Sequence, residues 1–445
     1  MSAPLAASNS TPLERDARVV NARGHHHDVH PGEIAIGVII GRTSEFFDFF
    51  VYAIASVLVF PSLIFPQVDA LTGTLYSFAL FPLAFLARPL GSLIFITIDR
   101  RYGRGVKLTI SLFLLGLSTI AMAFVPGYQQ IGVAAAWFLA ALRIGQGIAL
   151  GGVWDGLPSL LALNAPQKHR GWYAMIPQLG APLGLLVASG LFAFFSSALP
   201  AQDFLAWGWR YPFFVAFAIN VVALFARLRL VVTPEFEHLF ETRELQPASI
   251  RETLREDGRI VLLGAFAPLA SFALFHLVTV FPLSWAVLFN RESASRFLVI
   301  EMAGAVVGVL AMLASGLLAD RFGRRNVLGV SAGLIGVFSG LAPTLLDAGA
   351  SGELTYMLGG FLLLGLAFGQ SSGAINASFS GAHRYTGAAL TSDLSWLLGA
   401  GFAPLAALLL ASNFGLWAIG AYLLSGAVCT LVALGINKEL ARQTS

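Results

Sequence analysis

Twelve long apolar stretches constrain this chain of 445 residues more than any other feature. A helix needs about 20 apolar residues to cross the ~30 Å hydrocarbon core of a membrane. The stretches, each at least that long, are 34–60, 71–98, 106–125, 131–163, 171–199, 211–230, 260–289, 297–319, 326–346, 353–376, 384–411 and 414–436. Only 11% of the residues are charged, whereas soluble domains carry about 25%. The pattern predicts an all-α integral membrane protein with twelve transmembrane helices.

The distribution of Lys and Arg predicts which side of the membrane each connection faces. If both tails and the even-numbered connections share one side, that side holds 21 of the 27 basic residues and the other side holds three. Basic connections stay in the cytoplasm, so we expect a multi-pass inner-membrane protein with both termini cytoplasmic. The net charge of +3 is too small to predict nucleic-acid binding.

An internal repeat divides the chain into two halves. DRRYGRGVKL (99–108) follows the second stretch, and DRFGRRNVL (320–328) follows the eighth. A long polar connection at the midpoint separates six stretches from six, which is typical of transporters built from two pseudo-symmetric six-helix bundles. The expected domains are an N-terminal tail (1–33), a first bundle (34–230), a cytoplasmic linker (231–259), a second bundle (260–436) and a C-terminal tail (437–445).

Several motifs resemble those of the major facilitator superfamily. GLLADRFGRRNVL (316–328) is similar to its G-x-L-A-D-R-x-G-R-R-x-x-L loop, and LRIGQGIALGG (142–152) is similar to its fourth-span motif. Five further segments resemble its metabolite:proton symporter group, which includes proline/betaine, citrate, α-ketoglutarate and shikimate permeases. They are GRTSEFFDFFVY (41–52), ARPLG (87–91), WGWRYPFF (207–214), TPEFEHL (233–239) and GFAPLAALLL (401–410). The resemblance covers nearly the whole chain and implies the major facilitator fold, with a central cavity between the bundles.

The chain departs from the family pattern at three places. In the first-half loop, Ile96 replaces a glycine, and Asp99 stands one position early with Arg100 at the usual acidic position. After the fourth-span motif, Val153 replaces an acid and Asp155 follows two positions on. Asp393 is an additional acid in the eleventh stretch. These departures suggest coupling and substrate sites that differ from those of better-known members.

Three charges stand inside the first apolar stretch. Arg42, Glu45 and Asp48 are spaced i, i+3, i+6 and share one helical face, which Tyr52 continues. A charge at bilayer depth costs at least ~2.5–3.5 kcal/mol, and such carboxylates tend to line substrate or proton paths. We therefore predict that Glu45 or Asp48 exchanges a coupling proton; the alternative is a static ion pair that orients the helices. The remaining faces, which carry phenylalanines, are expected to contact lipid or neighbouring helices.

Other polar residues within the stretches complete the candidate site. The proton-coupling candidates are Glu45, Asp48, Arg143, Asp155 and Asp393. The role of Arg143 is implied by the resemblance, and a structural salt bridge with the first stretch is its alternative. The substrate-binding candidates are Arg42, Tyr52, Trp154, His276, Gln370, Asn376 and Trp396. For the neutral side chains and the histidine, the alternative is an interhelical hydrogen bond or a structural role.

The two basic loops are candidates for gating the transport cycle. Each carries an aspartate, a glycine that permits a tight turn and several arginines. By resemblance they form a charge latch that stabilises one access state. The residues are Asp99, Arg100, Gly103, Arg104, Asp320, Arg321, Gly323 and Arg324.

The resemblance implies secondary active transport of a small polar metabolite, an organic acid or a zwitterion, by proton symport with alternating access. A proton-independent uniporter or exchanger, or a transporter-like ligand receptor, is the alternative. No Walker loop or recognisable catalytic motif is present, so we expect neither an enzyme nor a cofactor. HHHDVH (25–30) has the composition of a metal-binding tract, but its place in a tail implies no fixed ligand geometry, and we expect no metal site. The expected partners are the substrate, protons and the lipid bilayer, with the chain acting as a monomer.

Overall fold

The computed structural model describes residues 31–153, 156–231, 248–290, 292–377, 379 and 383–436. All regular secondary structure in these residues is helical. Within the described residues, eleven continuous or interrupted helices are long and apolar enough to cross a membrane. The twelfth expected span is the 28-residue helix α2 (Pro31–Leu58), which contains Arg42, Glu45 and Asp48. The all-α fold with its helical spans is therefore confirmed.

The first half begins with α2 and continues through five further spans, several of which are interrupted. Its other helices are α3 (Phe60–Ile64), α4 (Ala70–Ala79), α5 (Pro82–Tyr102), α6 (Arg104–Met122), α7 (Tyr128–Ile131), α8 (Ala134–Val153), α9 (Leu157–Asn164), η1 (Gln167–His169), α10 (Arg170–Met175), η2 (Ile176–Leu179), α11 (Gly180–Ala198), α12 (Ala201–Ala206), η3 (Gly208–Arg210) and α13 (Tyr211–Val231).

The second half has the same organisation. Its helices are α15 (Ile250–Phe266), α16 (Leu269–Thr279), α17 (Phe281–Trp285), η4 (Ala286–Asn290), α18 (Ala294–Phe322), α19 (Arg324–Asp347), α20 (Gly349–Phe368), α21 (Ser371–Ala377), α22 (Arg384–Trp396), η6 (Leu397–Gly401), α23 (Ala403–Phe414) and α24 (Trp417–Ile436). Because α15 begins at Ile250, the described end of the expected 231–259 linker is already helical. The domain boundaries stay predictions.

The repeat seen in the sequence recurs in the backbone of the two basic turns. Gly103 links α5 to α6 with φ 84°, and Gly323 links α18 to α19 with φ 83°. Each glycine N–H donates to the carbonyl four residues earlier, at Asp99 and Ala319 respectively. Asp320 is therefore equivalent to Arg100, so the displaced aspartate of the first loop is a real structural difference. We call the end of the molecule that carries these turns the basic end.

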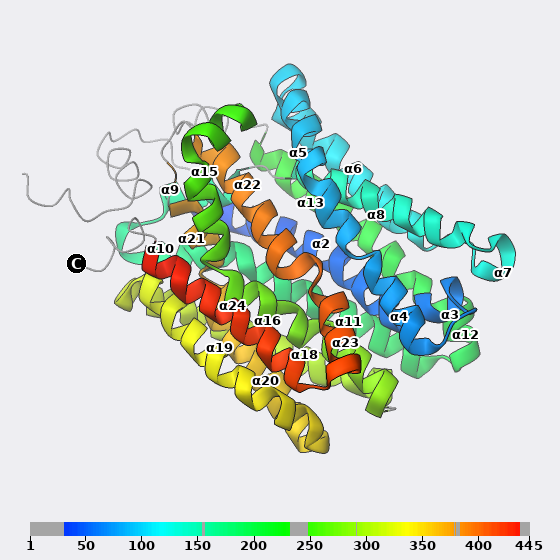
Figure 1. Cartoon of the computed structure of the whole chain (residues 1–445). Coiled ribbons are helices and arrows are strands. Elements are labelled where there is room, and N and C mark those ends of the chain that lie inside the picture. Colours follow the sequence, from blue (N-terminus) through cyan, green and yellow to red (C-terminus); the bar gives the residue numbers. More distant parts are fainter. Residues whose placement is uncertain are drawn as a thin grey trace, which may run out of the picture.

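The two halves lie side by side and meet along two interfaces (Figure 1). At one interface α11 packs against α18, and at the other α5 packs against α22 and η6. Helix α2 packs against α11 and α13 of its own half, while its aromatic residues contact the second half. Its charged residues are thereby placed at the centre of the molecule.

Candidate functional site

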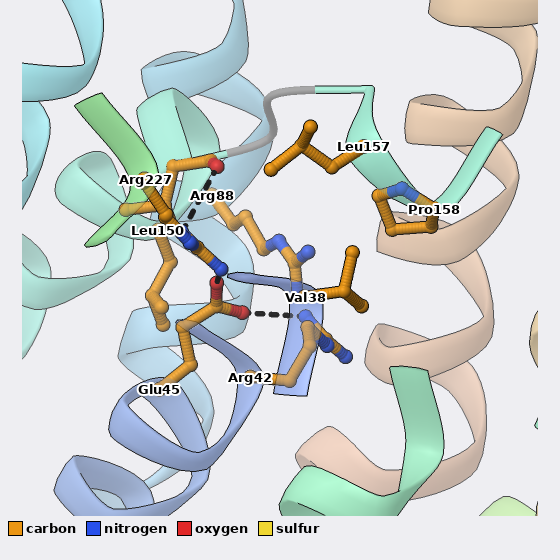
Figure 2. Close-up of a pocket in the computed structure, with 9 residues that line it drawn as sticks. Val38, Arg42, Glu45, Arg88, Leu150, Leu157, Pro158 and Arg227 are labelled. Atoms are coloured by element: carbon orange, nitrogen blue, oxygen red, sulfur yellow. Dashed lines mark hydrogen bonds and ion pairs between the residues drawn. The ribbon is translucent and has the colours of Figure 1, made fainter. Parts of the chain in front are cut away.

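A small cavity surrounds the charged residues of α2. Its volume is about 20 Å³, enough for a single water molecule. Figure 2 shows three arginines and one glutamate converging on it, from α2, α5 and α13. The lining residues are Val38, Arg42, Glu45, Arg88, Leu150, Val153, Leu157, Pro158 and Arg227. We call it the arginine cavity.

Glu45 is held by two arginines in this cavity. Arg42 Nη1 and Arg227 Nη2 each donate to a different oxygen of the Glu45 carboxylate, at 2.5 Å. Arg42 reaches Glu45 because the two residues lie one helical turn apart. Arg227 is a buried residue of α13 whose position near a polar connection gave no signal in the sequence. The Arg227–Glu45 ion pair therefore joins α2 to α13 within the first half.

Arg88 forms the other ion pair of the cavity and joins the two halves. Its Nε lies 2.6 Å from Asp393 Oδ1, and Ser92 Oγ donates to Asp393 Oδ2 at 3.1 Å. Arg88 and Ser92 belong to α5, and Asp393 belongs to α22. The extra acid of the eleventh stretch is thus the second-half partner of a first-half arginine.

Asp48 lies on the same stripe of α2 but in a different environment. It is buried, and Asn220 Nδ2 of α13 donates to its Oδ2 at 2.7 Å. Ser44 Oγ in turn donates to Asn220 Oδ1 at 2.6 Å. Among the described residues, the other carboxyl oxygen, Oδ1, has no hydrogen-bond partner, and no Lys or Arg forms an ion pair with Asp48. Asp48 therefore holds its place through neutral groups alone.

Arg143 makes no ion pair with any carboxylate that the structure describes. Its Nη1 donates to Gln146 Oε1 at 2.7 Å, and its Nη2 donates to the Phe81 carbonyl at 2.8 Å. Its guanidinium carbon lies 3.9 Å from the centroid of the Tyr52 ring, a cation–π contact. Arg143 thus contacts the first span through an aromatic ring, whereas the alternative set out above was a salt bridge.

A second cavity of about 20 Å³ lies between the two halves, and we call it the interface cavity. It shares Arg42 and Pro158 with the arginine cavity. Its residues come from α2, α9 and η2 of the first half and from α16, α21 and α22 of the second. They are Arg42, Pro158, Pro177, Gln178, Phe272, Ser372, Ile375, Ser392 and Trp396.

An aromatic cluster fills the space between the halves on the far side of the cavities from the basic end. Phe46 and Trp396 stand 5.6 Å apart, Phe50 and Phe275 5.7 Å, and Phe49 and His276 5.3 Å, measured between ring centroids. Phe81, Phe85, Phe272 and Phe368 complete the cluster. The α2 members of the cluster, Phe46, Phe49 and Phe50, therefore face neighbouring helices. The cluster closes the centre of the molecule in this conformation.

His276 belongs to this cluster. Its side chain is fully buried, and neither ring nitrogen has a hydrogen-bond partner in the described structure. Phe49, Phe81 and Phe275 surround the ring at centroid distances of 5.2 to 5.3 Å. Among the substrate-binding candidates, Arg42 and Trp396 line the interface cavity, whereas His276 lies in the aromatic cluster and does not line it.

The second-half basic loop makes a contact between the halves at the basic end. Asp320 accepts hydrogen bonds from the backbone N–H groups of Gly171 at 2.6 Å and Trp172 at 3.3 Å. Gln370 Nε2 donates to the Gly171 carbonyl at 3.2 Å. Arg324 Nη1 donates to the Gly373 carbonyl at 2.9 Å within the second half. Gln370 therefore lies beside this loop and lines neither cavity.

The first-half basic loop reaches the second half through a different set of residues. Asp99 Oδ2 lies 2.9 Å from Lys107 Nζ, and Lys107 Nζ donates to the Tyr385 hydroxyl of α22 at 2.7 Å. The guanidinium of Arg104 lies 5.5 Å from the Tyr385 ring centroid. Arg100 and Arg321 are exposed side chains, one in each of the two turns. Lys107 and Tyr385 were not among the candidates, because a lysine in a basic loop looks like a headgroup anchor.

Three candidates fall outside what the structure describes. Trp154 and Asp155 lie outside the described residues, as does the HHHDVH segment, and the side chain of Asn376 is likewise not described. Of the residues that form the site, Arg227, Asn220 and Gln178 were not predicted. Asn220 and Gln178 are single polar residues in apolar segments, and nothing in the sequence distinguishes them from residues in ordinary interhelical hydrogen bonds.

Comparison with known proteins agrees with this architecture. Residues 34–257 match the family described as "Sugar (and other) transporter". The chain is 37% identical to the inner membrane metabolite transport protein YhjE of Escherichia coli, covering 93% of this chain and 95% of that protein. It is 30% identical to the Escherichia coli shikimate transporter, covering 92% and 94% respectively. A crystal structure of a D-xylose–proton symporter has a similar fold, with a TM-score of 0.70, 18% identity and coverage of 89% and 96%.

Proposed function

The chain belongs to the sugar (and other) transporter family of the major facilitator superfamily, and we propose that it carries a small carboxylate-bearing metabolite together with protons. Secondary transport of small substrates follows from its family. The proposed substrate is an organic acid or a zwitterion. By analogy with the relative named as an inner membrane protein, we place the chain in the inner membrane, with its basic end in the cytoplasm.

The arginine cavity is the observation that carries the proposal. Among its described residues, three guanidinium groups face one carboxylate, that of Glu45. Arg88 is also paired with Asp393 from the other half. As the halves separate, a substrate carboxylate can take the place of the protein carboxylate in such an ion pair, because a guanidinium binds a carboxylate through bidentate hydrogen bonds. In this proposal the protein carboxylates neutralise the arginines of the substrate site while no substrate is bound.

Alternating access requires the closed contacts to open in turn. On one side of the cavities lies the aromatic cluster, and on the other lie the two basic-end contacts at Asp320 and Tyr385. The cavities are too small for a metabolite in this conformation. We therefore assign the described conformation to a closed step of the cycle, from which either set of contacts separates.

Asp48 is the proposed carrier of the coupling proton. It can take up or release a proton without breaking an ion pair, whereas Glu45 has two arginine partners. Arg143 and Tyr52 lie on neighbouring surfaces of the same half and link α8 to α2. A change in the charge of Asp48 would therefore act on the packing of the helix that also carries Arg42.

Uptake into proteoliposomes tests the proposal. Net uptake of a substrate carboxylate above its external concentration, driven by an inward proton gradient and abolished by a protonophore, is expected. Uptake that reaches equilibrium but ignores the gradient would instead identify a uniporter or exchanger. Binding without any flux would identify a ligand receptor. A panel of organic acids, proline and glycine betaine, first screened by thermal shift, supplies the substrate, since a ligand that binds the folded state raises its melting temperature.

A further inference from the structure

A buried glutamate joins the two halves at a place that is separate from both cavities. Glu301 of α18 is fully buried, and Ser189 Oγ of α11 donates to its Oε2 at 2.9 Å. These two helices form one of the interfaces between the halves (Figure 1). Glu301 lies near the start of α18, whereas Gly323 and the basic end follow the last residue of that helix. The contact therefore lies toward the opposite end of the molecule, which we call the outer end.

Among the described residues, no cation is placed to balance a charge on Glu301. Its Oε1 has no hydrogen-bond partner, and no Lys, Arg or His forms an ion pair with it. Arg296, the nearest arginine along α18, is half-exposed and lies 3.2 Å from Glu292. Of the elements that pack against α18, helices α11, α17, η2 and η4 contain no titratable residue, and α20 contributes Glu353 and Tyr356.

The remaining charged residues near α18 lie at the ends of the molecule. Those of α10, α19, η1 and the last turn of α18 belong to the segments 168–170 and 320–325 at the basic end, where Asp320 contacts Gly171. The exception is Asp347, which is exposed at the outer end. Glu301 is thus surrounded by apolar groups and one serine hydroxyl.

These surroundings determine which protonation state the closed contact allows. An ionised carboxylate loses its hydration on burial, and only an opposite charge or several hydrogen bonds can compensate for that loss. Ser189 supplies a single donor, so the contact suits a neutral carboxyl group that carries a proton. When the halves separate at the outer end, water reaches Glu301, and the carboxyl group can release this proton to the external solution. Closing the outer end then requires the proton to bind again.

We propose that Glu301 is a second proton-binding site, at which an external proton must bind before the outer end can close. The proton controls the contact between α11 and α18 but does not cross the membrane, because Glu301 stays buried while the basic end opens. It returns to the side from which it came, in contrast to the coupling proton assigned to Asp48. This inference rests on the alternating access and the orientation proposed above, but on no particular substrate.

The accessibility of a cysteine beside the contact tests the inference without a substrate. Ala193 is buried and lies four residues after Ser189, on the same face of α11. In the Cys429→Ser background, Ala193→Cys should react with a membrane-impermeant maleimide in intact cells only while the outer end is open. Its labelling rate is divided by that of Asp347→Cys, so that the pH dependence of the thiol reaction cancels. We expect this ratio to rise between about pH 6 and pH 8 outside, by up to about tenfold per pH unit, because opening releases one proton.

Three variants separate proton binding from packing. Glu301→Gln can still accept the hydrogen bond from Ser189 but cannot ionise, so its labelling ratio should be low and independent of pH. Ser189→Ala removes the hydrogen bond and keeps the carboxyl group, so labelling should increase at low pH and still rise with pH. Glu353→Gln is the matched control, because Glu353 is also buried with an unbonded Oε1, but its neighbour Glu292 belongs to the same half. The control should keep the wild-type pH dependence.

Transport distinguishes this proton from the coupling proton. Under the same imposed pH gradient, Glu301→Gln should reach the wild-type accumulation ratio, because no transported proton is lost. A lower ratio in folded protein would show that Glu301 carries protons across the membrane. A labelling ratio that ignores external pH, or that keeps its pH dependence in Glu301→Gln, would overturn the role of Glu301. If the wild-type protein labels as expected but accumulates no carboxylate, the proposed function fails and this inference stands.

Discussion

At the scale of single residues, the two carboxylates of α2 differ in what surrounds them. Asp48 accepts a hydrogen bond from Asn220 and leaves Oδ1 without a hydrogen-bond partner among the described residues. Asp48→Asn keeps the shape and the capacity to hydrogen-bond but removes titration. We expect the variant to lose gradient-driven accumulation while retaining counterflow exchange, measured in the same vesicles. Unchanged accumulation with the wild-type pH dependence would exclude Asp48 as the coupling residue.

Glu301 provides a matched control for this variant. It is a buried carboxylate of α18 that accepts a hydrogen bond from Ser189 Oγ of α11 at 2.9 Å, and its Oε1 is also unbonded. It lines neither cavity. Glu301→Gln should therefore preserve gradient-driven accumulation. Loss of accumulation in both variants would point to a general effect of buried carboxylates on folding or opening.

Glu45 is expected to respond differently, because it neutralises two arginines. Glu45→Gln leaves Arg42 and Arg227 without their carboxylate in a buried site. Breaking a buried ion pair in this way destabilises a protein by ~3–5 kcal/mol. We expect a lower yield of folded protein and a lower melting temperature in detergent. Wild-type stability combined with loss of proton-driven accumulation would instead transfer the coupling role to Glu45.

His276 is a buried polar side chain without a hydrogen-bond partner among the described residues, and this makes a stability prediction possible. His276→Phe replaces the imidazole by an apolar ring within an aromatic cluster. Removing an unpaired buried polar group stabilises the closed conformation by about 1–3 kcal/mol. The melting temperature should rise and the transport rate should fall, because opening must separate the cluster. A lower melting temperature of the His276→Phe variant would contradict this prediction, because the imidazole would then contribute to stability.

At the scale of elements, the second-half basic loop holds α10 of the first half. Asp320 accepts hydrogen bonds from two backbone N–H groups in the first turn of α10, so Asp320→Asn weakens charge-assisted hydrogen bonds worth about 1.5–3 kcal/mol. The variant should favour opening at the basic end and reduce net flux more than substrate affinity. Flux measured at equal protein levels, beside binding, checks this. Normal flux would contradict a latch role.

The first-half loop is built differently, although its backbone turn is the same. Asp99 pairs with Lys107, and the lysine, not the aspartate, reaches the second half through Tyr385. The displacement of Asp99 by one residue turns its side chain to another face of the helix, since successive residues are 100° apart. The two loops are thus related by backbone symmetry but make different contacts.

At the scale of the whole molecule, the basic end is expected to face the cytoplasm. The chain has one cysteine, Cys429, so a Cys429→Ser background permits labelling at single introduced cysteines. In intact cells a membrane-impermeant maleimide should label a cysteine at exposed Asp347 and spare one at exposed Arg101. Labelling from outside the cell of a cysteine introduced at position 101 or in the 231–259 linker would contradict this topology.

The amino-acid sequence alone determined the class of fold, the number of spans and the two-half organisation. These properties follow from local quantities: the length of apolar stretches, the placement of basic residues and a repeated turn around Gly103 and Gly323. It also predicted that Arg42 and Glu45 share a face, because helical spacing is a local property. The repeat did not reveal that the two loops contact the opposite half through different residues.

Tertiary structure decided which groups meet. Arg227 is 182 residues from Glu45, and Asp393 is 305 residues from Arg88, so helical periodicity contains no information about either pair. Asp48 and Glu45 look alike in the sequence, yet α13 brings an asparagine to one and an arginine to the other. The state of a buried carboxylate depends on its neighbours in space, and those neighbours are set by how the helices pack, not by the order of residues along one of them.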